Sequence, residues 1–440
     1  MSRGAKPPGP LEEGRVAALN HDGEGVVRET KTAFVPGALP GERIVFHRIR
    51  RHRQHDEGEL LEVLERSPSR VEPRCAHFGI CGGCALQHLD TAAQLVAKQS
   101  ELAESLSRIG RVEPRRWLEP LVGPVWNYRR RARLGAKWVP KRERVLVGFR
   151  ERQKPYIAAL ERCGVLAAPL DGLITPLSQL LTALKARVSI PQIEAVVGDD
   201  GVLLVFRNLV ELGEEDRAAL LEFGKAHSLR ICLQPDGLDS VISLDGLSTM
   251  LEYRLIDEGL LFKFQPTDFV QVNGVMNRVL VRCAIDLLEL KSSHRVLDLF
   301  CGLGNFTLPI ARRVREVVGV EGEAGLVDRA RHNAQINQLT NVRFHVANLA
   351  EPDGGSMSLG GHFDRILLDP PRVGAIELLP KLVRLGASRI VYVSCHPGTL
   401  ARDVGVLCNK HGYRLAAAGV VDMFPHTTHV ESIVVMEADR

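Results

Sequence analysis

Hydrophobic and polar residues alternate in short runs along residues 12–66, and Gly, Pro and Asn-His-Asp turns separate the runs. Alternation with a period of two is typical of β-strands that bury one face. The runs predict five short strands within residues 14–20, 23–29, 32–50 and 59–67. Five such strands that close on themselves indicate a small OB-like β-barrel, a fold that often binds oligonucleotides.

Residues 67–265 are less regular and predict a central α+β region. Residues 91–110 place apolar side chains at helical spacing, and Gly110 is expected to end this helix. On a structural interpretation alone, residues 126–154 would form a β-hairpin with one basic face and one apolar face. The later runs in this region have strand character and indicate structural strands.

Residues 266–440 alternate apolar runs of strand length with helical patterns. The strand-like runs are residues 294–300, 316–322, 341–348, 363–371 and 389–395. Strand and helix in alternation predict an α/β domain with a parallel sheet and helices on both faces. Ligands of such sheets bind beyond the carboxyl ends of the strands, so the residue at each strand end is a candidate site residue.

Composition and length limit the class of protein. The chain has 440 residues, of which 45% are apolar and 25% charged, as in a globular protein of two or three domains. The N-terminal residues MSRGAKPPGP lack the apolar core of a signal peptide, and no apolar run reaches the roughly 18 residues that span a membrane. We therefore expect a cytoplasmic protein without a membrane partner. Nine cysteines in a chain of this length do not form a disulfide framework, so clustered cysteines indicate metal binding or catalysis.

Positive charge gathers in two places, although the net charge of the whole chain is only +4. Residues 43–53 hold five arginines. From Arg129 to Lys154, eleven Lys or Arg residues stand against two acids, with aromatic residues interleaved. Basic groups neutralise phosphates and aromatic faces stack on unpaired bases, so this mixture favours single-stranded or looped RNA. For residues 43–53 the alternative is a solvated edge strand that its charge keeps soluble. For residues 126–154 it is a β-hairpin with one basic face and one apolar face, which is compatible with RNA binding.

The first strand of residues 266–440 runs into a turn that contains Gly302 and Gly304, which allows close approach of the backbone to a ligand. Thr307 replaces the third glycine of a pyrophosphate-binding fingerprint. Glu321 ends the next strand nineteen positions after Gly302, a spacing suited to a ribose diol. Asn348 follows the third strand and is placed to contact an adenine edge. A nucleoside without a pyrophosphate fits this layout, and S-adenosylmethionine is the obvious candidate.

The fourth and fifth strands end in candidate catalytic residues. Residues 369–372, Asp-Pro-Pro-Arg, resemble the motif of methyltransferases that modify exocyclic amines, but Arg372 replaces the aromatic residue that stacks on the base. Cys395 ends the fifth strand, where nearby positive charge could lower the pKa of its thiol. Glu431 could act as an acid or base beside it if the preceding loop folds back over the sheet. Two histidines in that loop, His426 and His429, have no evident third metal ligand.

A methyl donor together with a nucleophilic cysteine suits one reaction in particular. Carbon 5 of uracil is a poor nucleophile until a thiolate adds to carbon 6 and places electron density on carbon 5. That carbon can then attack the methyl group, after which a base removes the carbon-5 proton and the thiol leaves. The uracil must leave the RNA stack to meet both groups.

The ordered motifs FVQVN, VLDLFCGLGNFTLP, VVGVEG, LLDPPR, VYVSCHPGTLARD and DMFPHTTHVES together resemble those of the RNA 5-methyluridine methyltransferases. The resemblance runs nearly the whole chain and is strongest to the branch that acts on uracil in 23S ribosomal RNA. It implies a TRAM domain over residues 12–66, a central domain over 67–265 and a Rossmann-like class I methyltransferase domain over 266–440. It also implies Cys395 as the nucleophile and Glu431 as the proton acceptor. The implied contacts to S-adenosylmethionine are Gln271, Phe300, Asn305, Glu321, Asn348 and Asp369.

The resemblance also gives an interpretation of the cysteines. In this branch three clustered cysteines and a distant fourth hold a [4Fe-4S] cluster. The corresponding residues are Cys75, Cys81, Cys84 and Cys163. Four thiolates would equally suit zinc on spacing alone, and the resemblance favours iron. Because methyl transfer contains no redox step, we expect a structural or RNA-positioning role for the cluster.

The expected activity is therefore methylation of carbon 5 of a flipped uracil in 23S ribosomal RNA by a monomer. Pro371 and His396 differ from the residues often found in relatives, without removing a reacting group. Close alternatives are a methyltransferase for transfer RNA or for another ribosomal uracil. A more distant one is an inactive RNA-binding assembly factor, against which the intact glycines, Cys395 and Glu431 argue. An amine methyltransferase is disfavoured by Arg372.

Overall fold

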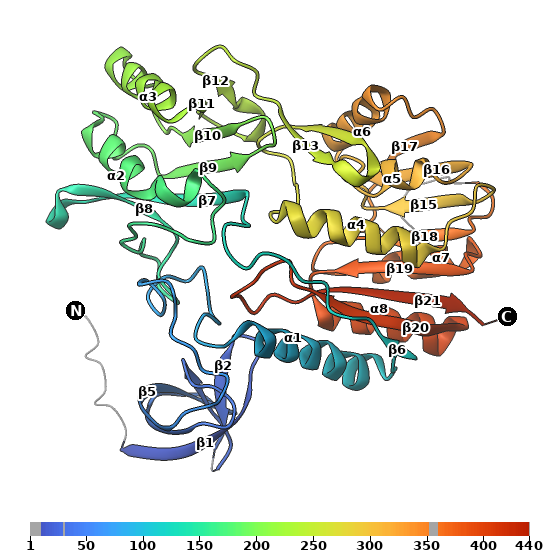
Figure 1. Cartoon of the computed structure of the whole chain (residues 1–440), viewed down its shortest axis with the longest axis horizontal. Helices are drawn as coiled ribbons and strands as arrows, with labels where there is room; N and C mark the ends of the chain where they lie inside the picture. The colour runs from blue at the N-terminus through green and yellow to red at the C-terminus, as the bar shows by residue number, and fades with distance from the viewer. Residues whose placement is uncertain (1–9, 30, 352–359, 440) are drawn as a thin grey trace. The chain divides into compact units, whose positions relative to one another are not determined.

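The computed structural model describes residues 10–29, 31–351 and 360–439 (Figure 1). Residues 1–9, which hold most of the segment expected to lack a targeting signal, lie outside the described residues. The chain divides into two compact units, which are described separately. The smaller comprises Met1–Glu101, Glu151–Lys154 and Phe424–Thr428, and the larger comprises Leu102–Arg150, Pro155–Met423 and His429–Arg440. Among the described residues, no helix is both long and apolar enough to cross a membrane.

The smaller unit begins with a closed five-stranded barrel, as the alternating pattern predicts. Its strands are β1 (Leu11–Leu19), β2 (Glu24–Val27), β3 (Ala33–Pro36), β4 (Arg43–Arg51) and β5 (Asp56–Glu65). They pair in the closed order β1-β2-β3-β5-β4, and only β3 and β5 run parallel. The barrel is filled by small and β-branched side chains together with Phe46. Three of the five arginines of residues 43–53 lie on the exposed end of β4 or just beyond it, at Arg50, Arg51 and Arg53.

Helix α1 (Thr91–Ser105) starts in the smaller unit and continues as a π-helical turn, Leu106–Gly110, in the larger one. The expectation that Gly110 ends the helix is confirmed, because Gly110 is the last residue of the π-helical turn. The left-handed residue is Arg111, with φ +52°, while Gly110 packs against helix α8 (Pro397–His411). A Cβ atom at Gly110 would lie 2.6 Å from the carbonyl oxygen of Ala401, so this glycine is required by the close approach of two backbones.

The larger unit holds a six-stranded mixed sheet in the order β12-β11-β10-β9-β7-β8. Its strands are β7 (Arg131–Val139), β8 (Arg144–Gly148), β9 (Gln192–Val197), β10 (Val202–Arg207), β11 (Leu229–Gln234) and β12 (Ile242–Ser243). Helix α2 (Ile174–Ala183) packs against β8, and α3 (Glu214–His227) packs against β11. Single 3-10 turns lie at Pro140–Arg142, Leu170–Gly172, Leu238–Ser240, Ile256–Glu258 and Ile376–Leu378.

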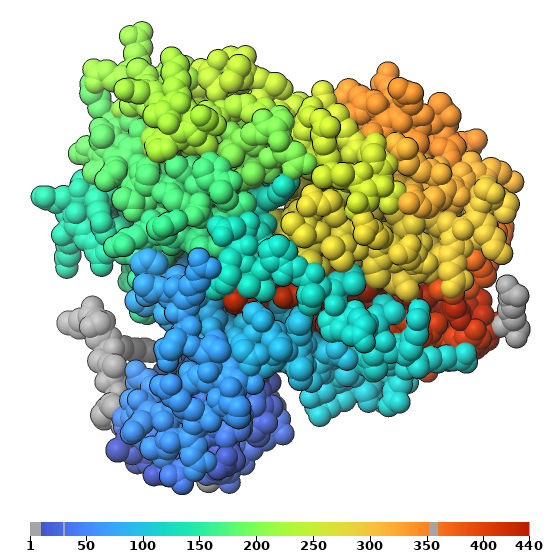
Figure 2. All heavy atoms as spheres, in the orientation of Figure 1, coloured from blue at the N-terminus to red at the C-terminus, as the bar shows by residue number. Residues whose placement is uncertain are grey.

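Strands β7 and β8 form the predicted basic hairpin. Alternate residues of β7 are buried in the core of the sheet, among them Ala132, Leu134 and Ala136, whereas Arg133 and Lys137 are exposed. All residues of the tip, 140–144, are exposed and include Lys141, Arg142 and Arg144. The hairpin extends away from the sheet as the teal projection at the left of Figures 1 and 2.

A second sheet of eight strands forms the rest of the larger unit, in the order β17-β16-β15-β18-β19-β21-β20-β6. The strands are β6 (Arg116–Trp117), β15 (Arg295–Leu299), β16 (Glu316–Glu321), β17 (Val342–Val346), β18 (Arg365–Leu368), β19 (Arg389–Ser394), β20 (Tyr413–Val421) and β21 (Glu431–Ala438). The five strands predicted for residues 294–395 are confirmed and run parallel. Strand β21 departs from the all-parallel expectation, because it runs antiparallel between β19 and β20.

Helices cover both faces of this sheet. Helix α4 (Gly274–Leu288) contacts β18, β19 and α5 (Thr307–Ala311), and α6 (Ala324–Ile336) contacts β16 and β17. Helices α7 (Leu379–Arg384) and α8 share a core with Leu297, Leu299 and Tyr392. A two-stranded hairpin, β13 (Leu251–Leu255) and β14 (Leu260–Phe264), packs against α6. The sheet is thus buried on both sides, and its strand ends remain as the edge where a ligand can bind.

The contact between Gly110 and α8 predicts an effect on stability. A Cβ at Gly405 would lie 2.5 Å from the carbonyl oxygen of Gly110, so we expect Gly405→Ala to lower the free energy of unfolding by about 1–3 kcal/mol. Denaturant unfolding measures the change. The matched control is Gly172→Ala, because no atom lies within 4 Å of the added methyl group there. Equal losses in both variants would contradict the prediction.

Candidate active site

The loop after β15 has the backbone conformation of a ligand-binding turn. Phe300, Gly302 and Gly304 have φ angles of +63°, +53° and +96°, in the left-handed region or next to it. The N–H of Gly302 donates to the Glu321 carboxylate at 3.0 Å, and the N–H of Gly322 donates to the same carboxylate at 2.6 Å. Glu321 at the end of β16 therefore lies beside the glycine turn, as its spacing in the sequence predicts.

Asn305 follows the turn, and its side chain belongs to a hydrogen-bonded cluster of polar residues that the sequence did not reveal. Its side-chain amide exchanges two hydrogen bonds with Asn277 of α4, each 2.9 Å long. The Tyr253 hydroxyl of β13 donates to the same Asn305 oxygen at 3.0 Å. The amide is thereby held in one orientation by groups from two other elements.

Three acidic side chains surround the ends of β15, β16 and β18. Burial, together with the negative charges of Asp369 and Glu321, raises the pKa of Asp298 to about 7, although the hydrogen bond from Thr307 lowers it. Burial likewise raises the pKa of Asp369 to about 7. Asp298 accepts a hydrogen bond from the Thr307 hydroxyl on one oxygen, while its buried Oδ1 has no hydrogen-bond partner among the described residues. A buried acceptor and an excess of negative charge suit a cationic ligand, and S-adenosylmethionine carries both an ammonium and a sulfonium group.

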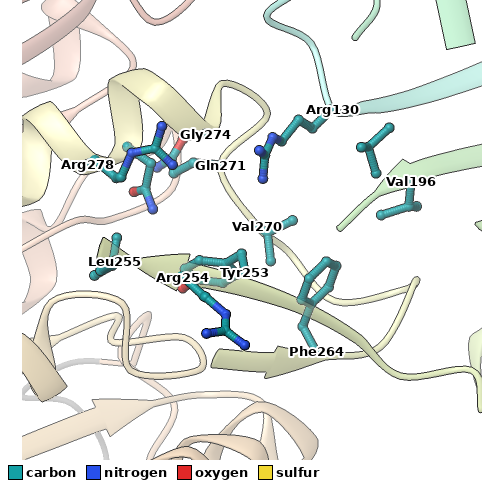
Figure 3. Close-up of a pocket in the computed structure, with 12 residues that line it drawn as sticks. Arg130, Val196, Tyr253, Arg254, Leu255, Phe264, Val270, Gln271, Gly274 and Arg278 are labelled. Carbon is teal, nitrogen blue, oxygen red and sulfur yellow. The ribbon is translucent and has the colours of Figure 1, made fainter. Parts of the chain in front are cut away.

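Gln271 lines a pocket beside α4 (Figure 3). Three arginines also line it, Arg130, Arg254 and Arg278, together with the aromatic Tyr253 and Phe264. In Figure 3 the Gln271 and Arg278 side chains lie next to each other near the start of α4. This pocket brings a residue of the expected cofactor site together with a basic residue of the segment that is expected to bind RNA.

Backbone contacts also join the residues next to Gln271 to the start of the basic segment. The N–H of Arg130 donates to the carbonyl of Val272 at 2.7 Å, and Arg129 forms an isolated β-bridge with Asn273.

Asn348 lies at the end of β17, where its side chain donates to Glu351 at 3.0 Å. It is exposed and follows the strand next to Glu321, at the carboxyl edge of the sheet.

Cys395 and Glu431 meet because of the antiparallel direction of β21. Ser394, the last residue of β19, is in register with Ser432. Glu431 precedes Ser432 and Cys395 follows Ser394, so the two residues lie across from each other at the ligand edge. Glu431 is 3% exposed, and Cys395 is partly exposed. The condition for pairing them, a loop that returns to the sheet, is thus met.

Neighbouring groups shift the pKa of the Cys395 thiol in opposite directions. Burial raises the pKa of its thiol, the negative charges of Glu431 and Asp369 raise it further, and the Arg372 guanidinium lowers it. Arg372 also lies 3.3 Å from the Nδ1 atom of His429. Arg372 is the positive group that favours the thiolate, a role that the sequence did not reveal because 23 positions separate it from Cys395.

Burial raises the pKa of Glu431 well above its usual range, and the negative charge of Asp369 adds to the effect. A carboxylate with a raised pKa is a stronger base than an exposed one. The arrangement thus places a thiol, a carboxyl group and a guanidinium at one edge of the sheet, beside the glycine turn.

The three clustered cysteines lie in a loop of the smaller unit. The N–H of Cys81 donates to the carbonyl of His77 at 2.9 Å, and the Cys81 sulfur accepts the N–H of Gly83 at 3.4 Å. Cys163 belongs to the larger unit. Within the described ranges, no three His, Cys, Asp or Glu side chains are grouped closely enough to hold a metal ion. Metal binding by Cys75, Cys81, Cys84 and Cys163 therefore stays a prediction.

The chain is similar to proteins of one known family. Residues 94–352 and 357–439 match the family described as tRNA (Uracil-5-)-methyltransferase. The chain is 50% identical over 423 residues to a protein of Stenotrophomonas maltophilia (strain R551-3), which covers 95% of each chain. It is 51% identical over 433 residues to one of Nitrosococcus oceani, which covers 98% of this chain and 96% of that one. Both relatives are named 23S rRNA (uracil(1939)-C(5))-methyltransferase RlmD.

A solved structure has the same fold over nearly the whole chain. It is the tRNA (uracil-54, C5)-methyltransferase of Pyrococcus abyssi in complex with S-adenosyl-L-homocysteine, with a TM-score of 0.74 and 25% sequence identity. The match covers 97% of this chain and 100% of that one. By its sequence and its fold, the chain belongs to the tRNA (uracil-5-)-methyltransferase family.

Proposed function

We propose that the protein transfers a methyl group from S-adenosylmethionine to carbon 5 of a uracil in 23S ribosomal RNA, through a covalent adduct with Cys395. The observation that carries the proposal is the position of Cys395 opposite Glu431, with Arg372 acting on the thiol. The names of the relatives at about 50% identity support 23S RNA as substrate and the equivalent of uracil 1939 as the target.

In this mechanism Cys395 adds as a thiolate to carbon 6 of the uracil. The new sulfur–carbon bond displaces the π electrons of the 5,6 double bond onto carbon 5, and Arg372 stabilises the thiolate before attack. S-adenosylmethionine supplies an electrophilic methyl group on a sulfonium. Gln271, Phe300, Asn305, Glu321, Asn348 and Asp369 are proposed to hold it, and the unpartnered Oδ1 of Asp298 adds a further acceptor.

Glu431 completes the reaction. Its carboxylate takes the proton from carbon 5, and the electrons of that bond restore the 5,6 double bond and expel the Cys395 thiolate. The raised pKa of Glu431 strengthens it as a base for this weakly acidic proton. Removal of Glu431 would therefore stop the reaction after methyl transfer, with the RNA still attached to the protein.

The basic hairpin and the arginine-lined pocket support an RNA substrate. Lys141, Arg142 and Arg144 at the exposed tip can contact phosphates, and Arg130 continues this charge to the pocket beside Gln271. Phe269, 69% exposed two residues before Gln271, offers an aromatic face for a base. We propose that the barrel is a TRAM domain that adds contacts, and that the protein acts as a cytoplasmic monomer on a flipped uracil.

A transfer-RNA substrate is the second candidate, because the similar solved structure is named for uracil 54 of tRNA. The ribosomal substrate is favoured because identity to that structure is 25%, against about 50% to the relatives named for 23S RNA. Methylation of both RNAs in parallel distinguishes the two.

We also propose that Cys75, Cys81, Cys84 and Cys163 hold a [4Fe-4S] cluster. Four thiolates are the donor set of such clusters, and the N–H···S bond from Gly83 to Cys81 is of the kind that stabilises a ligating thiolate. No step of methyl transfer passes through the cluster in this proposal. A zinc site with the same four ligands is the alternative.

The first prediction concerns the reaction itself. With 23S RNA carrying 5-tritiated uracil, wild-type protein should release tritium only when S-adenosylmethionine is present, and Cys395→Ala should release none. Cys408→Ala, another partly exposed cysteine, serves as control and should retain activity within about twofold. Methyl incorporation without tritium release would mean that an atom other than carbon 5 is methylated. Tritium release from transfer RNA alone would favour transfer RNA as the substrate.

The second prediction concerns pH. Arg372 lowers the pKa of the Cys395 thiol, so Arg372→Gln should raise that pKa and reduce the thiolate fraction at neutral pH. The alkaline-rising limb of kcat/KM should therefore move to higher pH, and Arg372→Lys should move it less. If kcat/KM instead falls by the same factor at every pH, Arg372 would be assigned to RNA binding.

The third prediction concerns the cysteines. Protein purified without oxygen should contain about four iron atoms per chain and absorb near 400 nm. Cys81→Ala should lose the iron and the absorbance, whereas Cys283→Ala should keep both. Stoichiometric zinc in a colourless wild-type protein would replace the cluster with the zinc alternative.

A further inference from the structure

Helix α8 carries a buried carboxylate that the proposed mechanism does not use, Asp403, which is 0% exposed. Its Oδ2 atom accepts hydrogen bonds from the Tyr392 hydroxyl of β19 at 2.8 Å and from the N–H of Ala375 at 2.7 Å. Its Oδ1 atom accepts one from the Arg402 side chain at 2.8 Å. Asp403 therefore joins β19, α8 and the loop that follows β18, residues 369–375, all of which belong to the larger unit.

The loop after β18 carries Arg372 and is bonded to α8 at further points. Residues 371–373 are exposed, so burial in the core does not hold this part of the loop. The Thr399 hydroxyl donates to the carbonyl of Arg372 at 2.9 Å, and the Arg402 guanidinium donates to the carbonyl of Val373 at 2.8 Å. The backbone that carries the Arg372 side chain is thus fixed to α8.

The loop approaches α8 so closely that a glycine is needed at the contact. Gly374 has φ +80°, and a Cβ atom there would lie 2.5 Å from Oδ2 of Asp403 and 2.7 Å from the Arg402 guanidinium. The N–H of Gly374 donates to the carbonyl of Pro371 at 2.9 Å, which closes the turn. The Asp403 carboxylate therefore fills the space directly beneath the turn.

The same helix is connected to the proposed nucleophile. Helix α8 begins at Pro397, two residues after Cys395, and Tyr392 lies three residues before Cys395. The thiol and the loop that carries Arg372 are therefore both held close to the Asp403 carboxylate. An arginine side chain has several rotatable bonds, so its charged end stays near a chosen atom only when its backbone is fixed.

Titratable and charged groups face the Cys395 thiol or adjoin it from the ends of three strands and the loops between them. They are Asp369, Arg372, His396, His429 and Glu431. The charges of Asp369 and Glu431 raise the pKa of the thiol, whereas Arg372 lowers it. A shift of the loop away from α8 would therefore weaken the effect that favours the thiolate.

We propose that Asp403 is a positioning residue that fixes where the Arg372 guanidinium lies relative to the Cys395 thiol. The inference rests on the proposed function, because it assigns a role in forming the nucleophile. Asp403 touches neither RNA nor cofactor in this proposal. Its loss releases the loop from α8, moves the guanidinium away from the thiol and reduces the thiolate fraction at neutral pH.

The test is Asp403→Ala, with the rate at which iodoacetamide alkylates Cys395 measured over a range of pH. Mass spectrometry of the peptide that contains Cys395 follows this thiol alone. We expect the midpoint of the pH profile to lie about 0.5 higher than in wild type and the rate at neutral pH to fall about threefold, since part of the effect of the neighbouring cation is lost. Asp403→Asn keeps an acceptor for the N–H of Ala375 and should restore most of the rate.

A double variant separates positioning from general destabilisation. Once Arg372→Gln has removed the guanidinium, adding Asp403→Ala should move the midpoint by less than about 0.2, because no cation remains to be displaced. The matched single-residue control is Asp216→Ala in α3. Asp216 is 5% exposed and accepts the N–H groups of Lys185 and Ala186, each at 2.9 Å, so a buried carboxylate with two backbone bonds is removed there. Its midpoint should equal that of wild type.

Thr399→Val provides a second test if Asp403→Ala does not fold. It removes the hydroxyl that bonds to the carbonyl of Arg372 from a partly exposed position, and it should move the midpoint in the same direction. An unchanged midpoint in the folded variant overturns the proposal, as does an equal shift in the control or a full further shift in the double variant. Alkylation requires no RNA, so these outcomes hold for any substrate. Absence of tritium release by the wild type overturns the proposed function instead.

Discussion

The direction of one strand decides whether this site can exist. Strand β21 enters the sheet between β19 and β20 in the opposite sense to β19, so the first residue of β21 lies beside the last residue of β19. A parallel strand would carry its first residue to the far edge, about five residues or 17 Å away. The thiol of Cys395 and the carboxyl of Glu431 share an edge only because the ladder is antiparallel. Every other group of the site is arranged around that edge.

Acidic and basic side chains lie at different places along this edge of the sheet. Asp298, Glu321 and Asp369 leave negative charge where a cationic methyl donor is proposed to bind, whereas Arg372 supplies positive charge beside the thiol. Burial makes the charged forms of the acids costly when no cation is present. A cationic ligand would relieve this cost, so the binding of the methyl donor and the ionisation of the acids are expected to support each other.

Much of the fold could be predicted from local pattern, because a strand that buries one or both faces shows it in its own residues. The barrel, the basic hairpin and the five parallel strands each gave such a signal. The antiparallel sense of β21 did not, since an apolar run has the same pattern in either direction. The sequence also could not show why position 110 must be a glycine, because its close packing against α8 depends on residues about 290 positions away.

In the candidate site too, some residues could be predicted from a local pattern, whereas others depend on contacts between distant residues. Cys395 and Glu321 could be found because a strand end or a fixed spacing marks them within a few residues of a motif. Arg372 and Asp298 could not be assigned their electrostatic roles, because these depend on distances across the sheet. The hydrogen bonds of Asn305 with Asn277 and Tyr253 come from two separate elements and leave no mark on the sequence near any one of them. The role of the cysteines came from resemblance and has not been tested by the geometry.

The composition of the smaller unit has a consequence for the order of events during synthesis. The hydrophobic core of its barrel consists only of barrel residues, so it can form soon after they emerge, since domains fold as they leave the ribosome. The loop around the cysteines is different: residue 80 pairs with the backbone of Arg152, and residues 85 and 86 pair with His426. These partners are made much later, the last of them within fifteen residues of the C-terminus. The smaller unit is therefore completed only after residue 426 has been translated, and a chain truncated before that residue would carry an unfinished cysteine loop.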